Sequence, residues 1–375
     1  MHYLDHAATT PMRPAAREAW LAVSDLTGSV GNPSSLHAAG RRARAIVEDA
    51  REAVAAALGA HPTEVVFTSG ATEANNLAIQ GAAAAIVVSS PIEHHSALDP
   101  VKWLESAGAA RVAWLPVEAT GVATIGALPE LNGDKGLVSL HWVNNETGVV
   151  QPVHEAVEAG RSAGYDVHSD AVQAVPYLTV DFAASGLTTM AVSAHKLGGP
   201  VGVGALLVTR EARLAPLAYG GGQQRFRSGT LDSAGAAAFA VALTETVAER
   251  EGEAARLGEM RDGLAAWVAA HVPDAAVTGV HVHTSPHILH IVLPGKSAEA
   301  MLTAFDLAGI EVSSGSACTA GIVDASHVLL AMGRSQVDAA SALRVSLGRT
   351  TTGADVDAFT QALPLVLAQA RAGGS

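Results

Sequence analysis

The sequence predicts an α/β protein built on a mainly parallel sheet with helices on both faces. Through the first two thirds of the 375-residue chain, short apolar segments bounded by turn residues alternate with segments of helical composition. The segments predicted as strands are residues 65–67, 86–88, 112–115, 138–143, 191–192 and 204–208. An amphipathic helix is predicted over residues 36–58, where charged side chains are interleaved with alanine and aliphatic ones.

The last third of the chain predicts a smaller α+β unit. A glycine-rich break at residues 220–222 precedes a long helix, rich in alanine and glutamate, over about residues 233–271. The strands predicted beyond it are residues 288–293 and 343–347, and the helices begin at residue 297 and cover residues 356–371. A chain of this length has room for two domains, each with its own core.

Composition and charge exclude several classes of protein. Hydrophobic residues make up 49% of the chain and charged residues 16%, which is typical of a compact fold. The net charge of −13, without a basic stripe, argues against direct nucleic-acid binding. No secretory signal is visible, and the longest uncharged stretch, residues 77–92, is too interrupted for a membrane span. The single cysteine excludes an intrachain disulfide and is consistent with the reducing cytoplasm.

A lysine and an aspartate at the ends of neighbouring predicted strands carry the chemistry. Lys196 follows the apolar stretch 189–193, so partial burial is expected to favour its neutral, nucleophilic amine. Asp170 ends the strand before it and can hold a proton on a pyridine nitrogen. A Schiff-base lysine and a carboxylate on the ring nitrogen are what pyridoxal 5'-phosphate (PLP) requires of a protein.

Further residues after predicted strands can serve the same cofactor, because ligands of open α/β sheets bind at the carboxyl ends of the strands. The turn at residues 69–73 precedes a helix, so the amide of Ala71, the helix dipole and the Thr72 hydroxyl can bind a phosphate. Ser193 and His195 flank the lysine and can add donors.

Three side chains are predicted to contact the ring or the substrate. His94 can stack on a flat heterocycle and move protons, although a structural role remains open in a chain with 16 histidines. Gln173 can donate to a phenolate oxygen on the ring, and Asn145 can contact the same oxygen or a substrate carboxylate.

Two residues in the last third have two interpretations each. Cys318 lies among small and hydroxyl-bearing residues with flanking glycines, which favours a mobile, reactive thiol over a packed, inert one. Arg344 lies inside an apolar strand, where it can bind a carboxylate ligand or form an internal salt bridge.

A histidine-rich segment offers a competing function. His281 and His283 are expected on one face of a strand, with His287 and His290 nearby, and such a group can bind a metal. No cysteine and no convincing carboxylate accompanies them. A non-catalytic metal or assembly protein is therefore the distant alternative.

Taken together, these motifs resemble the PLP-dependent cysteine desulfurases of the IscS/NifS type, in the class V aminotransferase group of fold type I enzymes. The resemblance covers nearly the whole chain, and the cysteine-bearing segment separates desulfurases from aminotransferases of the group. The motifs that carry it are residues 3–11, 31–35, 68–76, 93–95, 144–150, 168–173, 193–196, 227–230, 313–319 and 343–348.

The resemblance implies a large domain with a seven-stranded sheet over residues 14–250, and a small α+β domain of residues 1–13 and 251–375. It implies a homodimer in which Thr230 reaches the phosphate of the neighbouring subunit. Arg344, Asn145 and, more weakly, Asn32 would hold the substrate carboxylate. Lys196 would carry PLP and move the α-proton, with Asp170, His94, Gln173, Thr72, Ser193 and His195 around the cofactor.

The implied reaction converts L-cysteine to L-alanine and leaves the sulfur as a persulfide on Cys318. The acceptor would be an iron–sulfur scaffold or a tRNA-thiolating protein. A selenocysteine lyase, or another PLP-dependent enzyme of the same group, is the alternative activity.

Overall fold

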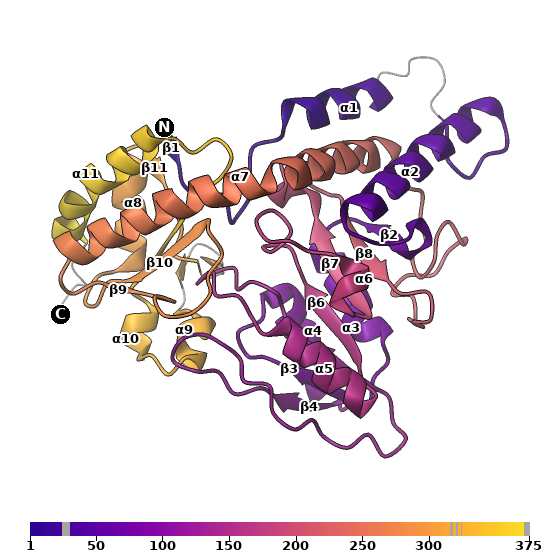
Figure 1. Cartoon of the computed structure of the whole chain (residues 1–375), viewed down its shortest axis with the longest axis horizontal. Helices are drawn as coiled ribbons and strands as arrows, with labels where there is room; N and C mark the ends of the chain where they lie inside the picture. The colour runs from indigo at the N-terminus through magenta and orange to yellow at the C-terminus, as the bar shows by residue number, and fades with distance from the viewer. Residues whose placement is uncertain (25–30, 316–317, 320–321, 324, 371–375) are drawn as a thin grey trace.

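A computed structural model describes residues 1–24, 31–315, 318–319, 322–323 and 325–370, without the side chains of residues 318–323. The larger part is a seven-stranded sheet in the order β2-β8-β7-β6-β5-β3-β4 (Figure 1). Only β8 runs antiparallel to its neighbours. The strands are β2 (Val65–Thr68), β3 (Ile86–Ser89), β4 (Arg111–Trp114), β5 (Gly136–Ser139), β6 (Asp166–Asp170), β7 (Thr189–Ser193) and β8 (Gly204–Val208).

Helices cover both faces of this sheet, because the strands are apolar on both sides. Phe67 and Val88 face the core shared with α2, α5 and α7, whereas Val66 and Val87 face α3 and α4. The helices of this part are α1 (Pro14–Ser24), α2 (Ala38–Ala57), α3 (Ala71–Gly81), α4 (His95–Ser106), α5 (Val153–Ala163), α6 (Phe182–Ser185) and α7 (Ser233–His271), with 3-10 turns η1 (Pro62–Glu64) and η2 (Ala194–Lys196).

The smaller part is built on the antiparallel sheet β14-β10-β9, with a core of its own. Phe305 and Phe359 stack there with ring centroids 5.1 Å apart, and full burial of each ring contributes roughly 1.5–3 kcal/mol. Its elements are β9 (Ala276–Val277), β10 (Ile288–Val292), α8 (Ala298–Leu307), β11 (Ile310–Glu311), β12 (Cys318–Thr319), β13 (Ile322–Val323), α9 (His327–Ala331), α10 (Gln336–Ala339), β14 (Ala342–Ser346) and α11 (Gly353–Gln369).

The two parts are joined by α7 and by the N-terminal segment. In Figure 1, α7 crosses the upper half of the view from one part of the molecule to the other, and its side chains enter both cores. Strand β1 (His2–Tyr3) pairs with β11, so the N-terminal residues start in the smaller part. The predicted domain boundary at residue 250 falls inside α7 and stays a prediction.

Two local predictions were wrong. The strand predicted over residues 138–143 ends at Ser139. This strand, β5, lies between β3 and β6, and β3 ends at Ser89, the residue that pairs with Ser139. Leu140 and Trp142 still donate backbone hydrogen bonds to β6. His281 and His283 lie outside any strand, where the chain turns between β9 and β10, so they share no strand face.

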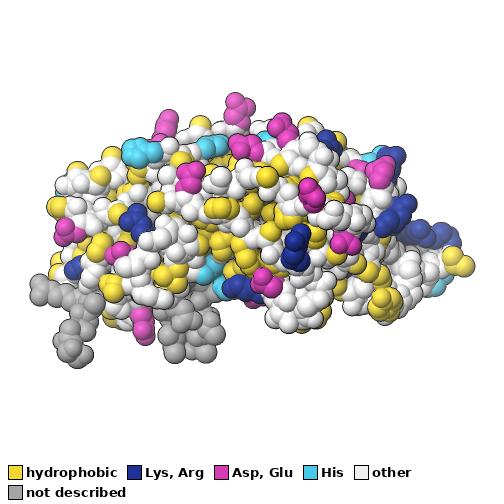
Figure 2. Space-filling view, turned by 90° about the horizontal axis from the view of Figure 1, so that it is seen from below, with side chains coloured by type: hydrophobic (Ala, Val, Ile, Leu, Met, Phe, Trp, Pro, Cys, Tyr) yellow, Lys and Arg dark blue, Asp and Glu magenta, His cyan; other side chains and the backbone are white. Residues whose placement is uncertain are grey.

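Among the described residues, none of the helices combines the length and apolar character that crossing a membrane requires. On the face drawn in Figure 2, acidic side chains are spread along the surface, and lysine and arginine also occur along it, with the most at the right-hand end, where Figure 1 places α2. That helix carries Arg41, Arg42 and Arg44. This face therefore carries no continuous basic stripe.

Candidate active site

A cavity of about 550 Å³ lies beyond the carboxyl ends of the central strands. The parallel register of β6 and β7, with Asp170 opposite Ala191, places the aspartate beside the strand that leads to Lys196. Most residues predicted for the site line this one cavity: Ala71, Thr72, His94, Asn145, Asp170, Gln173, Ser193, His195, Lys196 and Arg344.

Three predicted residues are not part of this set. Asn32 and Thr230 are exposed and line a different cavity of about 370 Å³, so within one chain they do not meet Lys196. Asn32 accepts a hydrogen bond from the Ser34 amide at 2.9 Å. The side chain of Cys318 lies outside the described part of the chain, and only its backbone, in β12, is described.

Lys196 ends the 3-10 turn η2, immediately after β7. Its Nζ donates to the backbone oxygens of Ala7 and Ala8, both at 2.6 Å, so the N-terminal segment crosses the site. Burial, together with the charge of the Arg344 guanidinium, lowers the pKa of Lys196 to about 8, while Asp5 and Asp170 oppose this shift. A neutral, nucleophilic amine is therefore available near physiological pH.

The turn before α3 is shaped to receive an anion. Gly70 is the N-cap with φ +146°, a conformation that favours glycine, and a Cβ there would meet only Ser193 Oγ, at 3.9 Å. The nearby Glu73 carboxylate is paired with Arg227 at 2.7 Å. Although burial opposes it, hydrogen bonds from Arg227 and Ser69 lower the pKa of Glu73. This pairing offsets the negative charge beside the helix terminus.

Asp170 and His94 both line the cavity, and both form hydrogen bonds with neighbouring residues of the chain. One oxygen of Asp170 accepts from the Val172 amide at 2.9 Å, and the other accepts from Asn75 Nδ2 at 2.6 Å. His94 is the N-cap of α4. Burial lowers the pKa of His94, although the Asp170 carboxylate opposes this shift, and the ring is therefore neutral at pH 7.

Gln173 is already engaged on both sides of its amide. Its Nε2 donates to the Ala7 oxygen at 2.8 Å, and its Oε1 lies 3.0 Å from His287 Nε2. Gln173 Nε2 has one further hydrogen, and the predicted contact with the phenolate oxygen of the cofactor ring would use that hydrogen.

Of the two interpretations that the sequence left open for Arg344, the structure shows the internal salt bridge, and the residue also lines the cavity. It forms an ion pair with Asp5 at 2.7 Å and donates to the backbone oxygen of Asn145 at 2.8 Å. Its buried Nε has no hydrogen-bond partner among the described residues.

Sequence reasoning missed several residues of the site. The backbone oxygens of Ala7 and Ala8 and the side chain of Asn75 carry no signal of their own in the sequence. Glu146 lines the cavity, and its Oε2 accepts from Ser326 Oγ at 2.5 Å. Burial raises the pKa of Glu146. Its place directly after Asn145, in the same strand-end segment, was the signal that could have identified it.

The residues of this cavity fit PLP. The glycine-capped helix terminus suits the phosphate, the lysine with a lowered pKa suits the aldehyde, and the Asp170 carboxylate suits the pyridine nitrogen. Among the described residues there is no group of three or more histidine, cysteine, aspartate or glutamate side chains that could hold a metal ion.

Comparison with known proteins agrees with this geometry. The family model described as aminotransferase class-V matches residues 2–359. The chain belongs to the class-V aminotransferase family. The chain is 46% identical to an IscS-like cysteine desulfurase of Mycobacterium tuberculosis, over 99% of this chain and 97% of the relative.

Solved structures of similar proteins show the same architecture. A NifS-like protein from Rickettsia africae superposes with a TM-score of 0.89 at 31% identity, covering 98% of this chain and 99% of that one. A structure described as SspA in complex with cysteine has a TM-score of 0.77 at 29% identity, covering 94% and 100%. The predicted fold class and PLP as cofactor are thereby confirmed.

The lowered pKa of Lys196 makes the uptake of PLP dependent on pH. The rate at which the cofactor-free chain forms its Schiff base should rise about tenfold per pH unit below pH 8 and level off above it, because the neutral amine is the nucleophile. Stopped-flow absorbance from about pH 6 to about pH 10 measures this. A rate that kept rising to the ordinary lysine pKa would contradict the burial of this amine.

Proposed function

We propose that this chain is a PLP-dependent cysteine desulfurase, which converts L-cysteine to L-alanine and holds the sulfur as a persulfide on Cys318. The observation that carries the proposal is the Lys196 amine, with its pKa lowered to about 8, sharing one cavity with Asp170 and Arg344. The similarity to an IscS-like cysteine desulfurase over 99% of the chain supports the choice of reaction.

PLP, when bound, supplies an electron sink for the bonds at the substrate's α-carbon. Lys196 binds the cofactor aldehyde and, once the substrate amine displaces it, its Nζ carries the α-proton. Asp170 keeps the proton on the pyridine nitrogen, and it is held for this by Asn75 and the Val172 amide. His94, whose ring is neutral, lines the same cavity as Asp170.

Arg344 and Asn145 orient the substrate through its carboxylate. The guanidinium of Arg344, which is paired with Asp5, and the side chain of Asn145 line the same cavity. Because the carboxylate is fixed, the substrate thiol is presented in one direction. The Cys318 thiolate then attacks that sulfur: the S–S bond forms, the C–S bond breaks, and its electron pair stays on the substrate carbon, which is later protonated to give alanine.

The assembly and the acceptor belong to the same proposal. A homodimer would let Thr230, which lies away from the cavity of its own chain, reach the phosphate site of the other subunit, and Asn32 lies beside it. The persulfide sulfur would pass to an iron–sulfur scaffold or a tRNA-thiolating protein. The single cysteine is consistent with action in the cytoplasm.

One experiment tests the reaction. L-Cysteine is added to the PLP-loaded protein, and alanine, sulfide and protein-bound sulfane sulfur are quantified. We expect alanine and sulfur in equal amounts, with the first sulfur bound to the protein. Alanine without sulfane sulfur on the chain would contradict the persulfide mechanism, and pyruvate in place of alanine would indicate a different reaction.

A further inference from the structure

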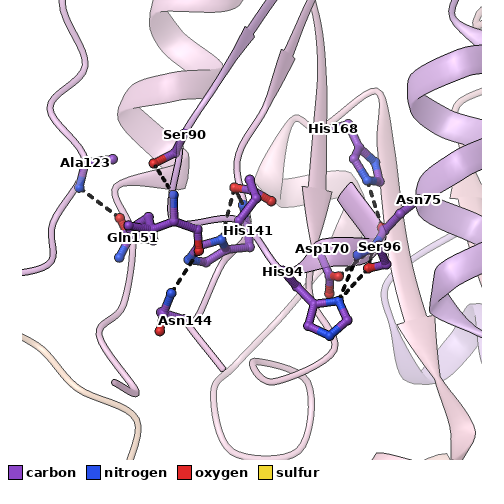
Figure 3. Close-up of polar contacts among 12 residues, drawn as sticks. Asn75, Ser90, His94, Ser96, Ala123, His141, Asn144, Gln151, His168 and Asp170 are labelled. Atoms are coloured by element: carbon purple, nitrogen blue, oxygen red, sulfur yellow. Dashed lines mark hydrogen bonds and ion pairs between the residues drawn. The ribbon is translucent and has the colours of Figure 1, made fainter. Parts of the chain in front are cut away.

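One buried amide lies behind the two groups that face the cofactor site. Asn75, in the second turn of α3, is completely buried. Its Nδ2 donates to Asp170 Oδ2 at 2.6 Å and to Ser96 Oγ at 2.8 Å, and its Oδ1 lies 3.0 Å from His168 Nε2. Figure 3 shows Asn75 among these three side chains, with His94 next to Ser96.

The orientation of the Asn75 amide is determined by its neighbours. The Asp170 carboxylate can only accept, so the NH₂ group must face it and the oxygen must face His168. Burial lowers the pKa of His168 to about 4, so the ring is neutral and its one proton is on Nε2. The other nitrogen then accepts from the Thr189 hydroxyl, at 2.9 Å.

The same amide also determines the state of His94. Ser96 Oγ accepts a hydrogen bond from Asn75 Nδ2. The Ser96 hydroxyl in turn donates to His94 Nδ1, with 2.7 Å between Oγ and Nδ1. The backbone amide of Ser96 donates to that nitrogen as well, at 3.1 Å. Because Nδ1 receives both bonds, the proton of the neutral His94 ring is on Nε2.

We propose that Asn75 is a positioning residue that orients Asp170 and His94 together toward the PLP ring. The carboxylate for the pyridine nitrogen and the ring that stacks on the cofactor are both attached to one amide, and neither can turn without breaking a buried hydrogen bond. A buried network in which each polar group has a partner holds one arrangement of its side chains. This inference rests on the cofactor and not on the sulfur step, so a failure of the desulfurase reaction would leave it standing.

The test compares Asn75→Ala with Asn76→Ala. Asn76 is the next residue of α3, and its amide donates to the backbone oxygens of Thr72 and Ser96 without contacting Asp170 or His94. Titration of the cofactor-free proteins with PLP gives the dissociation constant. We expect a rise of at least about tenfold for Asn75→Ala and less than about twofold for Asn76→Ala, together with a fall in kcat of up to about 100-fold for the former alone, because small misplacements are costly in catalysis.

A second variant and a double mutant separate positioning from general damage. Asn75→Asp keeps the size of the side chain but places an oxygen where Asp170 needs a donor, so it should weaken PLP binding at least as much as the alanine. In an Asp170→Asn background, Asn75→Ala should cost much less than in the natural chain, because the charged acceptor is gone. PLP binding by Asn75→Asp that equals that of Asn76→Ala, or equal costs in both backgrounds, would overturn the proposal. If Asn75→Ala does not fold, Asn75→Asp decides alone.

Discussion

Replacing Lys196 with alanine should abolish the turnover of L-cysteine and the covalent attachment of PLP. In the proposed mechanism the amine binds the aldehyde and moves the α-proton, and among the residues that the structure describes no other lysine lines the cavity. Loss of a positioned acid–base group alone costs about 10²–10⁴ in rate, and the loss of the covalent tether adds to this. The measurement is alanine formation, with the absorbance spectrum and borohydride trapping of the Schiff base read in parallel.

Two further variants test whether the loss of activity is specific to the Lys196 amine. Lys196→Arg keeps a positive charge near the Ala7 and Ala8 oxygens but cannot form a Schiff base, so it should be as inactive as the alanine. Lys135→Ala removes a lysine outside the cavity, paired with Asp166 at 3.6 Å, and should retain full activity. Borohydride trapping of PLP on the Lys196→Ala chain would place the cofactor on another lysine and end the proposed mechanism.

Replacing Cys318 with alanine should eliminate protein-bound sulfane sulfur while leaving PLP uptake intact. The chain has one cysteine, so about one sulfur per chain falls to none. The thiolate acts on the substrate sulfur and not on the PLP ring, and binding of PLP and of L-cysteine should therefore stay within about twofold of the natural chain. The measurements are cyanolysis of sulfane sulfur, alanine formation and the PLP dissociation constant.

The same variant separates the candidate activities. Cys318→Ser retains a hydroxyl of similar size but a far weaker nucleophile, and it should be as deficient with L-cysteine as the alanine. Selenocysteine has a better leaving group, and cleavage of selenocysteine by Cys318→Ala with loss of cysteine cleavage would fit a desulfurase with that side activity. Full sulfide release from L-cysteine by Cys318→Ala would refute the thiol mechanism.

Much of the site was predictable because its residues follow strands. Asp170 ends β6, and Lys196 follows β7 after one short turn, so both reach the carboxyl edge of the sheet. The apolar periodicity that predicts strands therefore also predicts which polar side chains meet. His281 and His283 show the opposite case, since alternation within three residues does not ensure a strand.

Local patterns could not predict how these side chains are held. Strands, turns and helix ends, and with them the positions of Lys196 and Asp170 at the carboxyl edge of the sheet, were determined by the sequence itself, because periodicity and turn residues act over a few neighbours. The tertiary structure alone decided that Asn75 binds Asp170, 95 residues away, and that Ala7 and Ala8 bind Lys196, 189 and 188 residues away. Such pairs form only when buried polar groups must find partners in the packed core, and that requirement has no period along the chain.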